Sequence, residues 1–299
     1  MPSFAPKQIL CPMDFSELSD LALKYAAVAA KQYGATLTVL HAETFELPRY
    51  FSSSQSEKFI QEMSRARKAV QRDLARNARK ILGPSEKGLN LKYEVAEAHP
   101  VRAILEAAEK ESSGLIVMGT QGRGGFKSLL LGSVAQNVVR NARTPIFVVR
   151  QKEHEFIDGA LTSLAPRLEC ILCPVNMTEW SRRAAEVASS LAEQFHSQLT
   201  LLYTIEQKDP EDPSKAIEKV ERWLSSEAKG PSGWKVVVRQ GHAAEQVISY
   251  AKEEKDDLII LAAQHKRFFE ATFFGETTEL VLRYAPVPVL ITPHFPAES

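Results

Sequence analysis

The chain repeats itself once, and this internal repeat constrains the fold more than any other feature of the sequence. The segment Ile9–Glu17 (ILCPMDFSE) recurs as Ile171–Glu179 (ILCPVNMTE), an offset of 162 residues. Leu115–Met118 recurs as Leu258–Leu261, at an offset of 143. A period of about 150 residues is several times the ~20–50 residues typical of solenoid repeats. The sequence therefore predicts a duplicated domain.

The change of offset places an insertion of 19 residues in the first copy, between Ala42 and His99. Two interpretations of this insertion remain open, a lid over a ligand and a surface loop, and we favour the loop because loops tolerate insertions well. Two domains also fit a length of 299 residues. We predict domain 1 over residues 1–150, a polar linker over 151–166 and domain 2 over 167–299.

Each copy alternates strand-like and helix-like segments. In the first copy, apolar runs predict strands at 7–11, 36–41, 91–95, 115–118 and 145–149, and helical spacing predicts helices at 17–33, 57–82, 101–110 and 134–141. Apolar strands that alternate with helices indicate a parallel sheet covered on both faces. With right-handed crossovers, the predicted fold class is α/β: two tandem doubly wound, Rossmann-like domains, each an open, mainly parallel five-stranded sheet with helices on both faces.

The composition excludes several classes of protein. Lys+Arg is 37 and Asp+Glu is 37, whereas proteins that grip nucleic acid or anionic membranes rely on excess positive charge. No apolar run approaches the ~20 residues that span a bilayer, and Asp14 follows too soon for a signal-peptide core. Three Cys are too few for a disulfide framework. We expect a soluble, cytoplasmic protein that binds neither nucleic acid nor membrane.

The segment after the fourth predicted strand has the composition of an anion-binding loop. It runs from Gly119 through Gly122 to Gly132 and Ser133, contains the basic residue Arg123, and leads into a helix. Glycines let backbone N–H groups approach an anion closely, and a helix N-terminus supplies donors and a favourable dipole. The spacing matches neither the Walker A loop nor the Rossmann dinucleotide fingerprint. Its place at the carboxyl end of a strand is where doubly wound sheets bind ligands.

Taken together, two motifs resemble those of the universal stress protein family. They are Gly119-x2-Gly122-x9-Gly132-Ser133 and, after the first predicted strand, the run from Pro12 to Ser16 (PMDFS). The resemblance covers nearly the whole chain and is to the ATP-binding branch of the family in its tandem, two-domain form. It implies that domain 1 binds ATP, accompanied by Mg²⁺, and that the protein is a nucleotide-sensing regulatory module of the stress response.

The resemblance also implies which residues contact the nucleotide. Asp14 would hydrogen-bond the ribose, and Ala42 and Met118 would bracket the adenine. The loop glycines and Ser133 would cradle the phosphates, while Arg123 or Lys127 could neutralise their charge. The full set of candidate binding positions is Pro12, Asp14, Ala42, Met118, Gly119, Gly122, Arg123, Gly132, Ser133 and Val134.

Each candidate also has a purely structural interpretation. Asp14 can help to cap the following helix, and the glycines can simply close a tight loop. His99 and His242 occupy one position of the repeat, just before a helix, which favours a capping or packing role over a ligand. Cys170 and Cys173 lie three residues apart on one predicted strand, so they face opposite sides of the sheet, which argues against metal or redox chemistry.

The second copy lacks most of the binding motif. Gly275 matches Gly132, but the other matching positions are changed: Asp14 to Asn176, Gly119 to Ala262, Gly122 to His265 and Ser133 to Glu276. Alanine at 262 can crowd the backbone or forbid a positive φ, and a carboxylate at 276 would repel phosphate. We predict that domain 2 does not bind ATP in the same manner. It is either a scaffold, which we favour, or a pocket for a more apolar ligand.

The closing strands predict how the copies meet. Pro145–Val149 and Val287–Ile291 are expected at sheet edges, which are open to pairing. Single-domain members of the resembled family dimerise through this strand, so the resemblance implies an intramolecular pseudo-dimer here. By the same analogy, two chains could associate as a homodimer.

Three hypotheses of function follow. The first is an ATP-binding regulatory module with one nucleotide site per chain. The second is a slow ATP hydrolase, for which only Gln121 offers itself to orient a water molecule. The third is a nucleotide-independent interaction or chaperone-like protein.

Overall fold

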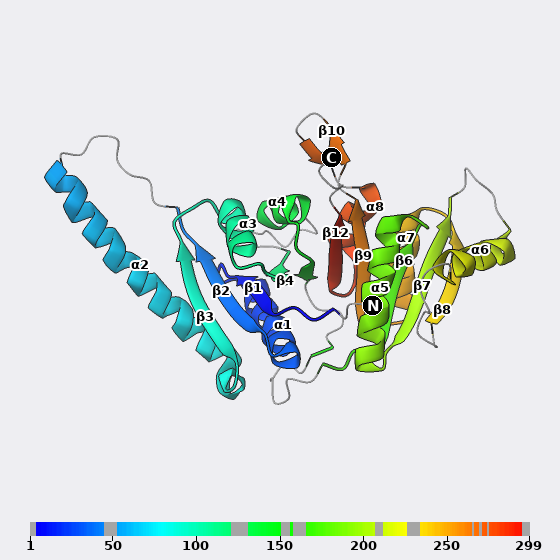
Figure 1. The fold of residues 1–299 in the computed structure, drawn as a ribbon, viewed down its shortest axis with the longest axis horizontal. Helices are drawn as coiled ribbons and strands as arrows, with labels where there is room; N and C mark the ends of the chain where they lie inside the picture. The colour runs from blue at the N-terminus through cyan, green and yellow to red at the C-terminus, as the bar shows by residue number, and fades with distance from the viewer. Residues whose placement is uncertain are drawn as a thin grey trace.

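The computed structural model describes residues 4–44, 53–120, 131–150, 156–157, 166–206, 212–225, 234–264, 266–268, 271–273 and 275–294. Its centre is one continuous sheet of ten strands, with helices on both faces (Figure 1). Each half of the chain contributes five neighbouring strands to this sheet. The α/β class, the tandem arrangement and the five-stranded domains are therefore confirmed.

The first half alternates strands and helices as its sequence pattern predicts. The elements are β1 (Gln8–Pro12), α1 (Glu17–Tyr33), β2 (Thr36–Ala42), α2 (Ser53–Leu82), the short 3₁₀ helix η1 (Gly83–Glu86), β3 (Asn90–Ala96), α3 (Pro100–Lys110), β4 (Leu115–Gly119), α4 (Ser133–Asn141) and β5 (Ile146–Val149).

The described part of the second half repeats this order of strands and α-helices, without a counterpart of η1 and with a small antiparallel hairpin added. The elements are β6 (Cys170–Val175), α5 (Glu179–Phe195), β7 (Gln198–Ile205), α6 (Pro213–Ser225), β8 (Trp234–Gln240), α7 (Ala243–Glu253), β9 (Leu258–Gln264), the hairpin strands β10 (Lys266–Phe268) and β11 (Ala271–Phe273), α8 (Glu276–Tyr284) and β12 (Val289–His294). The hairpin occupies the region that corresponds to the glycine loop of the first half, and the sequence pattern did not predict it.

The two halves join through their last strands. The strand order is β3-β2-β1-β4-β5-β12-β9-β6-β7-β8, and every pair in the sheet is parallel except β5 with β12. In that antiparallel pair Phe147 lies opposite Leu290 and Val148 lies opposite Val289. The predicted pairing of the closing strands within the chain is thus confirmed.

Two apolar cores lie on the two faces of the sheet. The core on one face is built on α1, α2, α5 and α6, and the core on the other face is built on α3, α4, α7 and α8. Both cores run through both halves of the chain, because side chains of β5 and β12 enter each of them. Cys11 and Cys173, at matching positions of β1 and β6, are completely buried, and this burial raises the pKa of both thiols.

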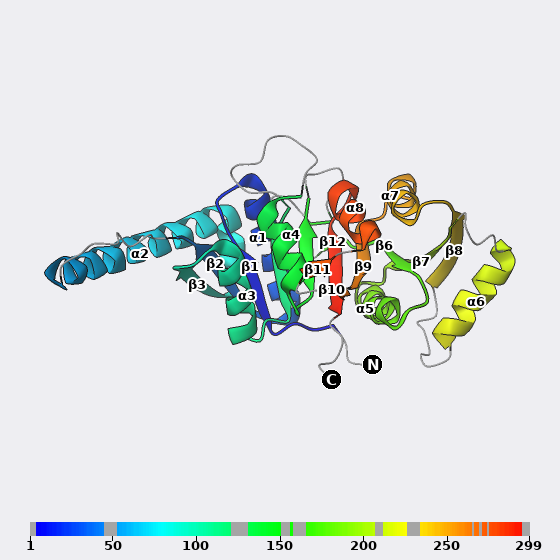
Figure 2. The ribbon, with the colours of Figure 1, turned by 90° about the horizontal axis from the view of Figure 1, so that it is seen from above.

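The insertion of the first copy is largely helical. Helix α2 has 30 residues, whereas its counterpart α6 has 13. The N-terminal part of α2 projects beyond the sheet, as both ribbon views show (Figures 1 and 2). The segment that precedes α2, residues 45–52, lies outside the described residues, so the choice between lid and loop is not tested there.

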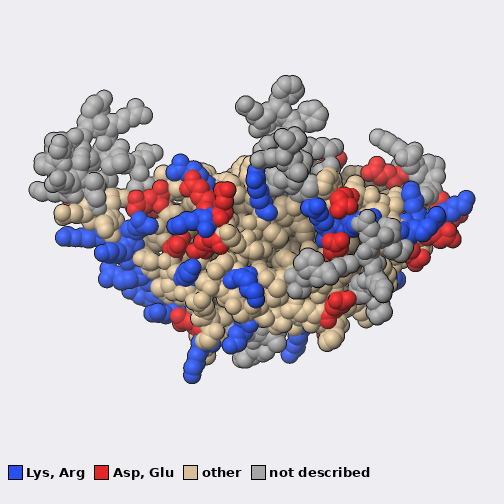
Figure 3. Space-filling view, in the orientation of Figure 1, with Lys and Arg blue, Asp and Glu red and all other residues tan. Residues whose placement is uncertain are grey.

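Net neutrality conceals an uneven distribution of charge. Positive side chains gather along α2 (Figure 3), where residues 65–80 contain one acidic residue, Asp73, against seven basic ones: Arg65, Arg67, Lys68, Arg72, Arg76, Arg79 and Lys80. Among the helices that the structure describes, none is long and apolar enough to cross a membrane.

Asp256, between α7 and β9, makes stability depend on pH. The residue is 2% exposed, and its Oδ2 has no hydrogen-bond partner in the described part of the chain. Burial, with the carboxylates of Glu254 and Asp257 nearby, raises the pKa of Asp256 to about 7 from its ordinary value of 3.8. The folded protein therefore holds a proton that the unfolded chain releases, and stability falls as the pH rises from about 4 towards 7.

We predict that Asp256→Asn raises the free energy of unfolding by about 1–3 kcal/mol at pH 8 and has little effect at pH 4. Denaturant unfolding at pH 4, 6 and 8 measures this. Asp257→Asn is the control, because the Asp257 carboxylate accepts hydrogen bonds from the N–H groups of Glu169 (2.6 Å) and Cys170 (2.9 Å). It should destabilise the protein at pH 8. An Asp256→Asn effect that is the same at every pH would refute the prediction.

Candidate functional site

The strand order of domain 1 creates a crevice at one edge of the sheet. The chain passes from β1 outwards to β2 and β3, and then crosses back to β4 and β5 on the other side of β1. The order therefore reverses between β1 and β4, and parallel strands direct their carboxyl ends to the same edge. Pro12, Ala42 and Gly119, which end β1, β2 and β4, meet there. This is the position at which open α/β sheets bind ligands.

A rigid turn connects β1 to α1 and holds Asp14 at the crevice. Asp14 Oδ1 accepts hydrogen bonds from Ser16 N (3.1 Å) and Ser16 Oγ (2.6 Å). Ser16 is in turn the N-cap of α1, since its Oγ accepts from Ser19 N (3.3 Å). Phe15, between them, has a φ of +62°, a left-handed conformation that is uncommon outside glycine. The predicted capping role of this motif is therefore confirmed.

His41 supports this turn from the neighbouring strand, and sequence reasoning missed it. The His41 Nδ1 atom lies 2.7 Å from the carbonyl oxygen of Met13, and its ring packs 4.9 Å from the ring of Phe15. Met13 N also donates to Leu40 O (2.8 Å). These contacts fix the turn to β2. Phe15, the residue with the left-handed backbone, is the one whose ring packs on His41.

Domain 2 builds the same turn without a carboxylate. Asn176 Oδ1 accepts from Thr178 N (3.3 Å) and Thr178 Oγ1 (2.6 Å), and Thr178 is the N-cap of α5. Met177 repeats the positive φ of Phe15, at +58°. An amide oxygen therefore satisfies the cap as well as a carboxylate does. The negative charge of Asp14 is not needed for this local structure.

Gly119 ends β4 against the first turn of α1. A Cβ atom built there would lie 2.9 Å from Leu18 Cβ and 3.1 Å from the carbonyl carbon and oxygen of Leu18. Gly119 is not among the described residues with a positive φ, so of the two effects expected of alanine here only the crowding is supported. The glycine brings β4 and α1 into direct contact at the crevice.

The ends of the glycine loop are closely held. Thr120 N donates to Val149 O (3.0 Å), and Gly132 N donates to Thr120 O (2.7 Å). The loop therefore leaves and re-enters the fold at nearly one point, beside the end of β5. Gly122 and Arg123, both candidate phosphate contacts, lie outside the described residues, as does Lys127.

The loop delivers the N-terminus of α4 to the same edge. Gly132 is the N-cap and has no side chain to bond the first N–H groups of the helix. Ser133 opens the helix with an exposed side chain, and Val134 is partly buried against the adjacent core. An uncapped helix N-terminus with an adjacent hydroxyl is well suited to an anion.

The two candidate adenine contacts, Met118 and Ala42, differ in how much of each residue is exposed at the crevice. The Met118 side chain is 4% exposed and packs in the core under α3 and α4, so little besides its backbone reaches the crevice. Ala42 is partly exposed at the end of β2. The next residue, Glu43, donates its N–H to Ala96 O (2.9 Å), which fixes this strand end against β3.

The corresponding edge of domain 2 carries a different set of side chains. Glu276 opens α8 where Ser133 opens α4, and its Oε1 lies 3.9 Å from His242 Nε2. His265 lies outside the described residues. His242 and its counterpart His99 are the N-cap residues of α7 and α3, but neither side chain makes a capping hydrogen bond. The side-chain capping role predicted for these two histidines is therefore wrong.

These features define the class of the molecule: a tandem α/β protein of two doubly wound, Rossmann-like domains, with a glycine loop at the switch point of the first. The universal stress protein family model matches residues 6–150 and 169–293. The chain belongs to the universal stress protein family.

Individual relatives match one half of the chain at a time. A universal stress protein of Methanocaldococcus jannaschii is 32% identical over 149 residues, which cover 50% of this chain and 85% of that protein. One from Thermus aquaticus is 37% identical over 145 residues, 48% of this chain and 98% of that protein.

Solved structures of two-domain length match the whole fold. A universal stress protein of Archaeoglobus fulgidus superposes with a TM-score of 0.68 at 22% identity, covering 98% of this chain and 99% of its own. One from Pseudomonas aeruginosa superposes with a TM-score of 0.65 at 16% identity, covering 97% and 94%. At these identities the likeness is one of fold.

We predict that Gly119→Ala lowers the free energy of unfolding by about 1–3 kcal/mol, because the new methyl group would meet backbone atoms of Leu18 that cannot move cheaply. Gly275→Ala is the matched control, since a Cβ there meets no atom within 4 Å. It should cost less than about 1 kcal/mol, the difference between glycine and alanine at an N-cap. Equal losses in the two variants, measured by denaturant unfolding, would contradict the packing role of Gly119.

Proposed function

We propose that domain 1 binds one ATP per chain and that the protein acts as a nucleotide-sensing regulatory module of the stress response, with domain 2 as its structural partner. One observation carries the proposal: both domains build the same turn after their first strand, but only domain 1 places a carboxylate in it. Because Asn176 maintains the same turn without a charge, the turn itself does not require the negative charge of Asp14, which supports a role for this carboxylate in ligand binding.

The residues of the crevice fit such a ligand. A carboxylate suits the paired hydroxyls of a ribose, and the uncapped N–H groups of α4 suit a phosphate. A divalent cation such as Mg²⁺ would neutralise phosphate charge alongside Arg123 or Lys127.

The equivalent edge of domain 2 disfavours the binding of ATP. Glu276 places a carboxylate at the helix N-terminus that would otherwise receive phosphate, and His242 lies beside it. The Glu276 side chain is largely exposed, but its carboxylate at the helix N-terminus would still repel a phosphate group placed there. We therefore assign binding to one site per chain.

Acid-denatured protein, as purified, should release about one adenine nucleotide per chain, and chemical analysis should show whether it is ATP or a hydrolysis product.

We predict that Asp14→Asn weakens ATP binding about 10–100-fold, the loss of a charge-assisted hydrogen bond, while the free energy of unfolding changes by less than about 1 kcal/mol. Titration calorimetry and denaturant unfolding measure the two quantities. The reverse change in domain 2, Asn176→Asp, is the control and should leave the stoichiometry at one. Unaltered ATP affinity in Asp14→Asn would exclude the ribose role of Asp14.

We further predict that Ser133→Glu, which copies Glu276 into domain 1, abolishes measurable ATP binding without unfolding the protein. A carboxylate in the first turn stabilises a helix slightly but repels phosphate. Ser133→Ala serves as the neutral control and should lose no more than about tenfold. If wild-type protein binds no nucleotide and its Tm does not rise with Mg-ATP, the nucleotide-independent interaction function is favoured instead.

A further inference from the structure

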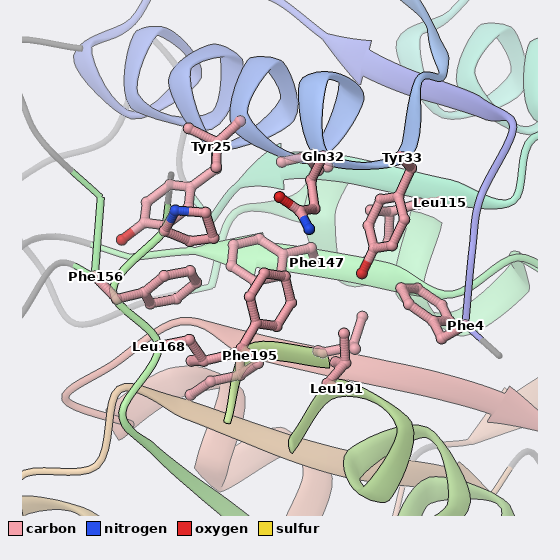
Figure 4. Close-up of a pocket in the computed structure, with 16 residues that line it drawn as sticks. Phe4, Tyr25, Gln32, Tyr33, Leu115, Phe147, Phe156, Leu168, Leu191 and Phe195 are labelled. Atoms are coloured by element: carbon pink, nitrogen blue, oxygen red, sulfur yellow. The ribbon is translucent and has the colours of Figure 1, made fainter. Parts of the chain in front are cut away.

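The junction of the two domains contains a small cavity between α1 and α5 (Figure 4). Residues at equivalent positions of the two copies line it, among them Ala29 with Leu191 and Tyr33 with Phe195. Its volume is about 70 Å³, and its almost wholly apolar lining offers little to a polar ligand. The cavity is therefore a gap in the interdomain core, and we assign it no ligand. The feature that most distinguishes domain 1 lies at its surface, along α2.

Helix α2 carries a stripe of positive charge on its solvent face (Figure 3). With ~3.6 residues per turn, six exposed basic residues fall within about a third of the helix circumference and extend over about 22 Å of its length. Leu74 and Ala78, on the opposite side, are completely buried. Arg67 lies off the stripe and pairs with Glu97 (3.6 Å). We call the six residues the basic stripe: Arg65, Lys68, Arg72, Arg76, Arg79 and Lys80.

Most of the basic stripe lacks a counter-charge. Arg76 pairs with Asp73 (3.0 Å), and these side chains are 80% and 61% exposed. Arg79 pairs with Glu86 (3.2 Å). Exposed pairs of this kind are weak, so an anionic ligand can displace them. The other four members of the stripe form no ion pair with a residue that the structure describes: Arg65, Lys68, Arg72 and Lys80.

The stability of α2 does not account for the basic stripe. Lys68, Arg72 and Arg76 follow one another at intervals of four residues, at which like charges repel and destabilise a helix. Arg79 and Lys80 lie in the last turn, where positive charge favours the helix dipole. The residues in the middle of the helix do not have this benefit. Their charge is therefore better explained by a ligand than by folding.

The counterpart helix in domain 2 has no such stripe. Helix α6 has 13 residues against the 30 of α2, although both helices contribute to the core on the same face of the sheet. Arg222 of α6 pairs with Glu218 at 3.9 Å. The charged residues of α6 alternate in sign, apart from the N-terminal one: Lys215, Glu218, Lys219, Glu221 and Arg222. The fold therefore requires neither the length of α2 nor its charge.

The zero net charge of the chain argues against nucleic-acid binding only where charges are evenly spread. Residues 65–80 hold seven basic residues and one acidic residue, so the rest of the chain has an acidic excess. At ~0.1 M salt the Debye length is about 10 Å, so a ligand at the basic stripe is influenced mainly by charges nearby. A basic stripe along one helix is a typical electrostatic footprint of nucleic-acid binding.

The residues of α2 favour a nucleic-acid duplex over other polyanions. A line of cations matches phosphates that recur at regular intervals along a strand, and arginine occupies four of the six positions, which suits phosphate geometry. An interfacial membrane helix buries its apolar face in lipid, but Leu74 and Ala78 are already buried in the core. Residues 61–82 include no aromatic side chain on which single-stranded bases could stack.

We propose that the basic stripe of α2 binds the phosphate backbone of a double-stranded nucleic acid without reading its sequence. The cations neutralise phosphates and release the counter-ions condensed on the duplex, which drives binding and makes it sensitive to salt. The stripe faces away from the core, opposite Leu74, so the duplex can contact it along its whole length. This surface does not depend on the proposed nucleotide site.

Fluorescence anisotropy of a labelled random-sequence DNA duplex of about 20 base pairs, titrated with the full chain, tests the proposal. At about 50 mM NaCl the Kd should be on the order of 10 µM, and the plot of log K against log salt should have a slope of about −3 to −5. The triple variant Arg65→Gln, Lys68→Gln, Arg72→Gln should weaken binding at least tenfold and make the slope shallower by about 2–3.

The matched control neutralises three exposed basic residues of α6: Lys215→Gln, Lys219→Gln, Arg222→Gln. It changes the net charge equally and should leave the affinity for the duplex within about twofold of wild type. Thermal unfolding shows that each variant is folded. ATP titration of the α2 variant should give the wild-type affinity, and a wild-type chain that binds no ATP would leave the expected DNA binding unchanged.

Three results would overturn the proposal. The first is no saturable binding of the duplex by the wild-type chain at about 50 mM NaCl, and the second is an equal loss of affinity in the two triple variants. The third is tighter binding, per negative charge, to polyglutamate or to phosphatidylcholine vesicles with about 30% phosphatidylserine than to the duplex. That result would assign the basic stripe to an acidic protein or to a membrane.

Discussion

The antiparallel pairing of β5 with β12 is the contact on which the rest of the molecule depends. It turns two five-stranded sheets into one of ten strands and removes two hydrophobic edges that would otherwise be open to pairing with other chains. Phe147 and Leu290 meet there on one face of the sheet, and Val148 and Val289 on the other. Because Val149 also accepts the N–H of Thr120, the base of the glycine loop is anchored to the same junction.

Within this common framework the two domains have diverged at a few positions with clear physical consequences. The turn after the first strand keeps its cap and its positive φ in both copies, so local folding requirements persist. The two domains differ in charge at equivalent positions of the repeat. Asp14 of domain 1 corresponds to Asn176 of domain 2, and Ser133 corresponds to Glu276. Each exchange leaves the fold intact and alters what an anionic ligand would meet.

Much of the fold could be predicted from the sequence because its determinants are local or repeated. Apolar runs such as Leu115–Met118 predicted the buried strands, and the expected edge position of the closing strands, with the resemblance to the universal stress protein family, predicted their pairing. The role of Ser16 as N-cap was also predictable, because capping chemistry is local. The first helix turn of α2, at Ser53, lay four residues before the predicted start, in a polar stretch whose periodicity is weak.

Other features depend on contacts between distant segments, which spacing alone does not reveal. His41 supports the turn at Met13 from the next strand, and Gly119 is constrained by Leu18 of a helix about one hundred residues earlier. In domain 2 the β10–β11 hairpin lies where domain 1 has its glycine loop. The hairpin sequence has no alternation of apolar and polar residues clear enough to predict two strands. Of the candidate binding residues, those on strand ends and helix starts could be placed, whereas Gly122 and Arg123 fall outside the described residues.

The covalent link between the domains changes what the β5–β12 interface can contain. In a symmetric pair of identical chains, each residue on the axis must face a copy of itself, so any substitution enters the interface twice. Here the equivalent positions carry different residues, Ala29 in α1 against Leu191 in α5 and Tyr33 against Phe195. The two sides of the interface can therefore differ, which is not possible when two identical domains pair. Tethering also fixes the ratio of the two halves at one to one and maintains their contact at any dilution. An interface freed from symmetry and from concentration in this way can be altered on one side alone.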